Sequence, residues 1–195
     1  EVAPDLGTEG TAENAMAEYE AFIDACHEED IKVCFDFVIN HCGRHHPFFQ
    51  DTIAQQGDEP PNSDLTYPAV NEWNRSSKYF DWFDRIDAED RYEEGSNELV
   101  EVAPAAKGFF GLRLQPNWDF SNIALREHLL KAGLFWADKG VDAFRCDIAW
   151  GVPHSFWREF RDVVKAKDPE IMLLDETIPN RPHFAEGEFD MHFDT

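Results

Sequence analysis

Three strand-like segments alternate with helical segments, and this order constrains the fold more than any other feature of the sequence. The strand-like segments lie at 31–40, 141–148 and 170–176, and apolar residues at helical spacing occupy 15–26. Strands separated by helices pair in parallel through right-handed crossovers. The sequence therefore predicts an α/β fold with a parallel sheet.

The later helical segments carry recognisable ends. Ser121 or Asn122 can cap a helix that Gly140 closes, because short polar side chains satisfy the first free N–H groups and glycine tolerates a left-handed end. Pro153 suits the first turn of the next helix, where a free N–H is not needed. We therefore expect one helix on each side of the segment 141–148.

Residues 42–118 differ from the rest of the chain. They are rich in Pro, Asp, Asn and aromatic residues and lack sustained periodicity. Because this stretch is too long for an ordinary connection, we expect an inserted lobe between two segments of one domain, 1–41 and 119–195. Most of its aromatic residues should form a small core of the lobe, and two or three of them could stack on a sugar ring. The aromatic residues considered are Trp73, Tyr79, Phe80, Trp82, Phe83, Tyr92, Phe109 and Phe110.

Each predicted strand ends on polar residues, which are costly to bury without a role. The pairs are Asn40 with His41, Arg145 with Asp147, and Asp175 with Glu176. Ligand sites of parallel sheets lie beyond the carboxyl ends of the strands. We therefore expect the three pairs to meet at one functional rim, although helix caps and solvated loop starts would also place polar residues there.

Two carboxylates on neighbouring strands suit acid–base or nucleophilic work on a glycosidic bond. Arg145 and Asp147 lie two residues apart and share one face of a strand, so the guanidinium favours the ionised form of Asp147. The apolar residues before Glu176 favour its protonated form. A purely structural ion pair is the alternative explanation for Arg145 and Asp147.

The segment NHCGRHHPFF gathers several potential metal ligands, but their spacing matches no known zinc pattern. We expect His45 and His46 to be solvated loop residues. His41, at the end of a strand, is a better candidate for a hydrogen bond to a substrate hydroxyl.

Composition narrows the classes of partner. Forty acidic residues against seventeen basic ones give a formal charge of −23, which disfavours binding to nucleic acid or to an anionic membrane. The acids are spread along the whole chain, which favours a halophilic source.

No apolar run approaches the roughly 20 residues that span a bilayer, so we expect a soluble protein. The four cysteines form no C-x-x-C pair, so buried free thiols and a reducing, cytoplasmic setting are favoured. Neither end resembles a natural terminus, so we expect a fragment.

Four segments resemble, in order, the conserved regions of the α-amylase family of glycoside hydrolases. They are DFVINH, LQPNWDFSN, VDAFRCDIAW and LLDET. Further stretches, such as HPFFQDTIAQ and SSKYFDWFD, are most similar to neopullulanases, cyclomaltodextrinases and oligoglucosidases. The resemblance implies part of a (β/α)8 TIM barrel, about strands three to five, with the inserted lobe after the third strand. It also implies retaining hydrolysis of α-glucosidic bonds in starch-derived glucans or maltooligosaccharides.

The resemblance also implies a role for individual residues. Asp147 is expected to be the nucleophile, Glu176 the acid/base and Arg145 the arginine that supports the nucleophile. Asp36 is expected to be a buried aspartate that pairs with this arginine. His41 matches a histidine that contacts the sugar, and we place it with Asp36 and Trp150 in the substrate-binding group. Asn40 matches an asparagine that binds calcium in many members, so calcium is a possible ligand and no cofactor is required.

The sequence also departs from the family pattern. Asp175 replaces the usual glycine before the acid/base, and Trp150 and Gly151 stand where many members have lysine and histidine. The third catalytic acid expected after the seventh strand lies beyond this chain. The alternative function is therefore a catalytically inactive relative with a carbohydrate-binding or assembly role. A cofactor-binding doubly wound domain is disfavoured because no G-x-G-x-x-G segment is present.

Overall fold

A parallel sheet forms the centre of the first of two units into which the chain divides. This unit consists of Glu1–Val38 and His128–Thr195, and the second unit is Ile39–Glu127. The computed structural model describes residues 3–56, 70–86, 89–92, 99–102, 105–111, 115–177 and 187–194.

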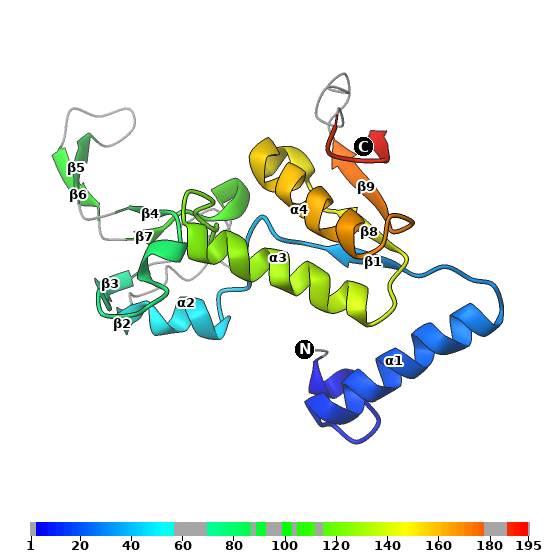
Figure 1. Ribbon diagram of the computed structural model, residues 1–195. Helices are drawn as coiled ribbons and strands as arrows, with labels where there is room; N and C mark the ends of the chain where they lie inside the picture. Colours follow the sequence, from blue (N-terminus) through cyan, green and yellow to red (C-terminus); the bar gives the residue numbers. More distant parts are fainter. Residues whose placement is uncertain are drawn as a thin grey trace. The chain divides into compact units, whose positions relative to one another are not determined.

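The sheet contains four parallel strands in the order β1-β8-β9-β10 (Figure 1). These strands are Cys34–Phe37, Ala143–Cys146, Met172–Thr177 and Met191–Asp194. The predicted α/β fold with a parallel sheet is confirmed. The expectation of three strands was wrong, because the short segment MHFD adds β10 beside β9. The first strand is also shorter than expected, since only the middle of 31–40 takes part in pairing.

Among the described residues, three α-helices belong wholly or largely to this unit: α1 (Ala12–Glu28), α3 (Ile123–Asp138) and α4 (His154–Lys167). The predicted cap of α3 is confirmed, since Oδ1 of Asn122 accepts a hydrogen bond from the N–H of Leu125 at 3.0 Å. The prediction for Pro153 needs a small correction. This residue is the N-cap of α4 and precedes its first turn.

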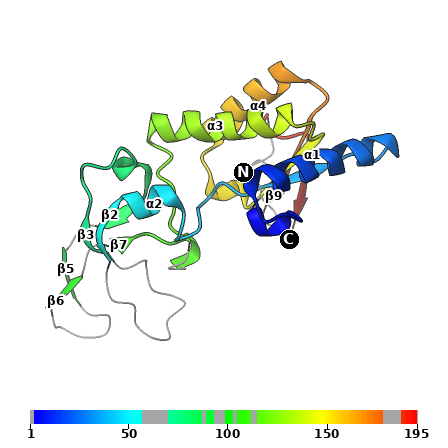
Figure 2. The same ribbon diagram turned by 90° about the horizontal axis from the view of Figure 1, so that it is seen from below.

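Helices α3 and α4 lie along one face of the sheet (Figures 1 and 2). Phe160 of α4 is fully buried, and its ring stacks on Phe37 at 4.9 Å and meets Phe144 edge-on at 5.4 Å. Gly133 allows α3 to approach this ring, because a Cβ built there would lie 2.2 Å from Cε2 of Phe160. Since side chains alternate along a strand, residues between these aromatic positions project from the opposite face. That face carries the candidate site.

The second unit contains short elements around an aromatic core. Helix α2 spans Pro47–Asp51, and the antiparallel pairs are β2 (Ile53–Gln56) with β3 (Val70–Trp73), β4 (Arg85–Ile86) with β7 (Ala105–Ala106), and β5 (Glu89–Tyr92) with β6 (Leu99–Val102). Of the aromatic residues singled out from the sequence, Trp73, Trp82 and Phe83 are buried, whereas Phe110 is exposed. The side chain of Tyr92 lies outside the described residues. His46 was expected to be a solvated loop residue, but its Nδ1 accepts a hydrogen bond from the N–H of Phe48 and caps α2.

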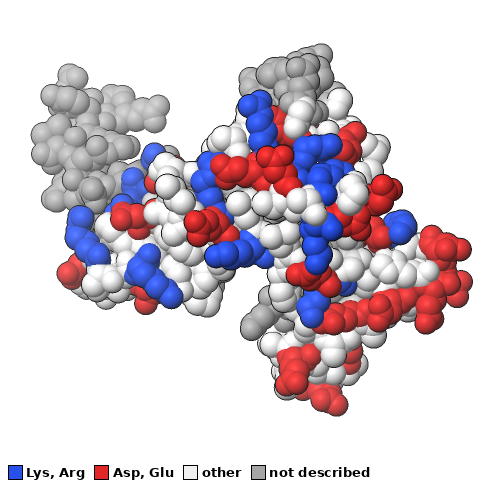
Figure 3. Space-filling view, in the orientation of Figure 1, with Lys and Arg blue, Asp and Glu red and all other residues white. Residues whose placement is uncertain are grey.

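The surface reflects the acidic composition. Figure 3 shows Asp and Glu side chains gathered over α1, which carries Glu13, Glu18, Glu20, Asp24 and Glu28. Within the described ranges, no helix has the length and apolar character needed to cross a membrane.

The four cysteines are free. Cys42 and Cys146 are buried, as expected, and burial raises the pKa of the Cys42 thiol to about 12. The expectation of burial was wrong for Cys34, which is exposed because it lies on the sheet face opposite α3 and α4.

Candidate active site

A single arginine joins three carboxylates at the carboxyl ends of neighbouring strands. Nη1 of Arg145 donates to Oδ1 of Asp36 at 2.7 Å and to Oδ1 of Asp147 at 2.5 Å, and its Nη2 donates to Oε2 of Glu176 at 2.5 Å. Strand register explains the meeting. Asp36 is directly opposite Arg145 on β1, and Glu176 lies two residues beyond Leu174, the partner of Arg145 on β9.

The guanidinium is thus shared more widely than the sequence predicted. The sequence assigned Arg145 to Asp147 and Asp36, whereas the structure adds Glu176. Burial lowers the pKa of Arg145, but its hydrogen bonds to Asp36 and Asp147 outweigh this effect and raise the pKa above its ordinary value. The arginine is therefore a permanent cation that can orient two carboxylates at once.

The carboxylates differ in their contact with solvent. The side chains of Asp147 and Glu176 are 17% and 12% exposed, whereas that of Asp36 is 61% exposed. The expectation of a buried Asp36 was therefore wrong. Its strand β1 is an edge of the sheet as described, and Asp36 projects from the face that α3 and α4 do not cover. Asp147 and Glu176 are thus better protected from solvent than Asp36.

Two further contacts at the site were not foreseen. The main-chain N–H of Ile148 donates to Oε2 of Glu176 at 3.2 Å. Cζ of Arg145 lies 5.8 Å from the centre of the Phe193 ring, which belongs to β10. A main-chain donor leaves no residue-type signal in a sequence. Phe193 could have been suspected only if β10 had been recognised.

The remaining predicted residues lie in different parts of the chain. Trp150 lies in a short 3-10 helix, Ala149–Gly151, which follows β8. His41 and Asn40 belong to the second unit, where the His41 ring stacks on Phe109 at 4.8 Å and Asn40 is buried. The structure therefore brings Asp36, Arg145, Asp147 and Glu176 together. His41 and Asn40 belong to the other unit.

The possible calcium site gains no support from the described residues. Calcium takes six to eight oxygen ligands, usually several of them carboxylates. In the part of the chain that the structure describes, no group of three or more His, Cys, Asp or Glu side chains could hold a metal ion.

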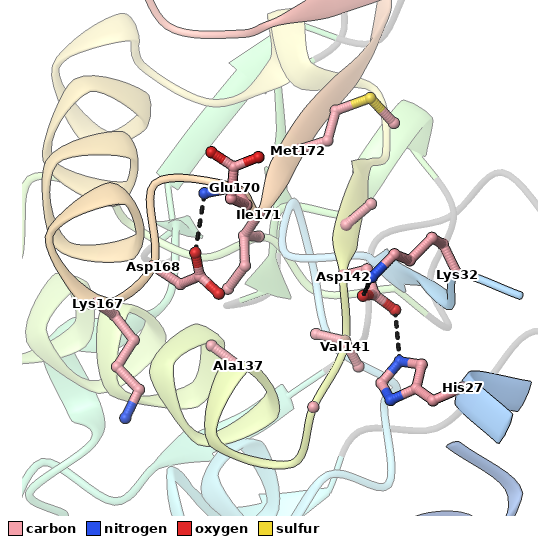
Figure 4. Close-up of a pocket in the computed structure, with 12 residues that line it drawn as sticks. His27, Lys32, Ala137, Val141, Asp142, Lys167, Asp168, Glu170, Ile171 and Met172 are labelled. Atoms are coloured by element: carbon pink, nitrogen blue, oxygen red, sulfur yellow. Dashed lines mark hydrogen bonds and ion pairs between the residues drawn. The ribbon is translucent and has the colours of Figure 1, made fainter. Parts of the chain in front are cut away.

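A cavity of about 630 Å³ lies at the other end of the same strands (Figure 4). Its lining includes Ala143 and Met172, the first residues of β8 and β9. Asp142 at its wall accepts hydrogen bonds from His27 Nε2 and Lys32 Nζ, both at 2.8 Å. Since the carboxylates meet at the carboxyl ends, this cavity is separate from the candidate active site.

Comparison with known proteins agrees with this geometry. Residues 7–187 match the family model described as alpha amylase, catalytic domain. The chain therefore belongs to the alpha-amylase family, whose catalytic domain is a (β/α)8 barrel. The resemblance noted from the four sequence segments is confirmed.

Individual relatives have names typical of this family. The chain is 39% identical over 198 residues to alpha-amylase MalA of Haloarcula japonica, with 100% of this chain and 23% of that protein covered. It is 33% identical over 167 residues to a cyclomaltodextrinase of a Bacillus species, with 85% of this chain and 25% of that protein covered. The first of these organisms is a halophile, in agreement with the source predicted from the acidic composition.

Solved structures of enzymes with related names also align with this chain. The ligand-free cyclic alpha-maltosyl-(1→6)-maltose hydrolase of Arthrobacter globiformis aligns with a TM-score of 0.68 at 25% identity, over 89% of this chain and 34% of that one. The type III pullulan hydrolase of Thermococcus kodakarensis aligns with a TM-score of 0.67 at 27% identity, over 92% of this chain and 27% of that one. The chain thus spans about a quarter to a third of the length of these relatives.

Proposed function

We propose that this chain is the part of a retaining glycoside hydrolase that cleaves α-glucosidic bonds in starch-derived glucans or maltooligosaccharides. The observation that carries the proposal is the single guanidinium of Arg145 that holds Asp147 and Glu176 at the ends of adjacent strands. The proposed substrate class is supported by relatives named alpha-amylase, cyclomaltodextrinase and neopullulanase.

The two carboxyl groups have complementary roles. Asp147 attacks the anomeric carbon, while Glu176 gives its proton to the glycosidic oxygen as the bond from that carbon to the leaving sugar breaks. A water molecule then attacks the same carbon, Glu176 takes a proton from this water, and the bond to Asp147 breaks. Two displacements at one carbon restore the original configuration. Arg145 fixes the direction of the Asp147 carboxylate through its hydrogen bond to Oδ1.

We also propose the place of this chain within the barrel. Strands β1, β8 and β9 would be the third, fourth and fifth strands, β10 would be the next, and the lobe 42–118 would be the insertion after the third strand. The strand order β1-β8-β9-β10 supports this assignment, because consecutive strands of a barrel are neighbours in the sheet. His41 and Trp150 are each proposed as substrate-binding residues, as the family resemblance implies.

The test replaces the nucleophile in the full-length polypeptide that contains these residues. Asp147→Asn removes the attacking charge, and kcat/KM for maltotriose should fall by at least about 10³-fold. Asp162→Asn, an exposed aspartate of α4, is the matched control and should change the activity less than about twofold. A fluorinated maltosyl fluoride should leave a covalent sugar on the peptide that contains Asp147. Asp147→Asn activity at the level of the control would refute the assignment.

A further inference from the structure

The turn after β8 contains a strained residue next to the proposed nucleophile. Ile148 has φ 40° and ψ 53°, which is the left-handed conformation. Branching at Cβ makes this conformation unfavourable. Among the described residues, Ile148 is the one β-branched residue with a positive φ. Such strain persists only where the surrounding structure enforces it, and it gathers at functional sites.

Hydrogen bonds on both sides of Ile148 enforce its conformation. Before it, the N–H of Asp147 donates to the carbonyl of Phe37 at 3.3 Å, which continues the pairing of β8 with β1. After it, Nε1 of Trp157 donates to the carbonyl of Ala149 at 2.8 Å, and Trp157 is buried in α4. The residue before Ile148 is thus hydrogen-bonded to the sheet and the residue after it to helix α4, so Ile148 must bridge two fixed points.

This connection points the N–H of Ile148 at a side chain. It donates to Oε2 of Glu176 at 3.2 Å, and Nη2 of Arg145 donates to the same oxygen at 2.5 Å. Neither an amide N–H nor a guanidinium can accept a hydrogen bond. A protonated Glu176 held in this way must therefore carry its proton on Oε1.

We propose that Ile148 is a positioning residue for the acid/base. Its main-chain N–H and Arg145 together occupy Oε2 of Glu176, so Oε1 is the oxygen that passes the proton to the glycosidic oxygen and later receives a proton from water. This inference rests on the proposed function, in which Glu176 is the acid/base. Ile148 acts through Glu176, whose Oε2 accepts its N–H.

The experiment removes this one N–H and leaves every side chain in place. In the full-length polypeptide, the amide N–H of Ile148 is replaced by an ester oxygen, and kcat/KM is measured for maltotriose and for α-maltosyl fluoride. Fluoride leaves readily without a proton, whereas the sugar of maltotriose needs one. We expect kcat/KM to fall about tenfold for maltotriose, as for the loss of one hydrogen bond to a charged group, and less than about twofold for the fluoride.

A second ester provides the matched control. The N–H of Val152 donates to the carbonyl of Ala149 at 3.2 Å in the same turn and does not touch Glu176. Its ester should leave the ratio of kcat/KM for the two substrates at the value of the unsubstituted protein. An equal loss on both substrates in the Ile148 ester, or no loss on either, would overturn the proposal. If the unsubstituted protein cleaves neither substrate, the proposed function itself fails.

Discussion

Replacement of Arg145 tests the architecture of the site most directly, because one side chain orients both proposed catalytic carboxylates. A hydrogen bond to a charged group contributes about 1.5–3 kcal/mol. The bond to Asp36 does not orient either proposed catalytic carboxylate, so its loss bears less directly on kcat/KM. Arg145→Met therefore loses the two bonds to Asp147 and Glu176, about 3–6 kcal/mol, which corresponds to a fall in kcat/KM of about 10²–10⁴-fold.

A lysine at this position separates charge from geometry. Its single ammonium keeps the positive charge but lacks the planar fork that reaches two carboxylates, so Arg145→Lys should lose one bond and about 10–100-fold in kcat/KM. The assay is the hydrolysis of maltotriose by the full-length polypeptide, with melting temperatures measured in parallel. Arg75→Met, at an exposed position of the second unit, is the control. The reasoning is refuted if Arg145→Met remains within about tenfold of the unsubstituted protein.

Two further predictions concern stability. Gly133→Ala places a Cβ against the buried ring of Phe160. The overpacking cost of about 1–3 kcal/mol should exceed the gain of about 1 kcal/mol in helix propensity, so the melting temperature should fall by a few degrees. This fall should be smaller when Gly133→Ala is made in a Phe160→Leu background. Equal falls in both backgrounds would contradict the overpacking explanation. Burial raises the pKa of Asp142, but hydrogen bonds from Lys32, the N–H of Val33 and His27 outweigh this effect and hold the pKa below 3.8. Its stabilising effect is therefore complete above that value and is lost as pH falls through the folded pKa. Asp142→Asn should lower the urea midpoint near neutral pH and do so less in acid, and an effect that is independent of pH would contradict this explanation.

The sequence alone determined the class of fold and the identity of the candidate residues. Apolar periodicity and end signals are local properties, so α1, the Asn122 cap of α3 and the strands β1, β8 and β9 could be predicted from them. The two-residue spacing of Arg145 and Asp147 predicted that their side chains point the same way, and the structure brings them into contact, although β8 ends at Cys146 and Asp147 follows it. The four family-like segments agree with the family match over residues 7–187.

Only the tertiary structure decided how these residues meet. Strand register brings Glu176 to the guanidinium of Arg145, and register depends on pairing between segments far apart in the chain. The strained conformation of Ile148 likewise follows from hydrogen bonds to β1 and α4. Side-chain type is written in the sequence, whereas the direction of a main-chain N–H is set by the packing around it.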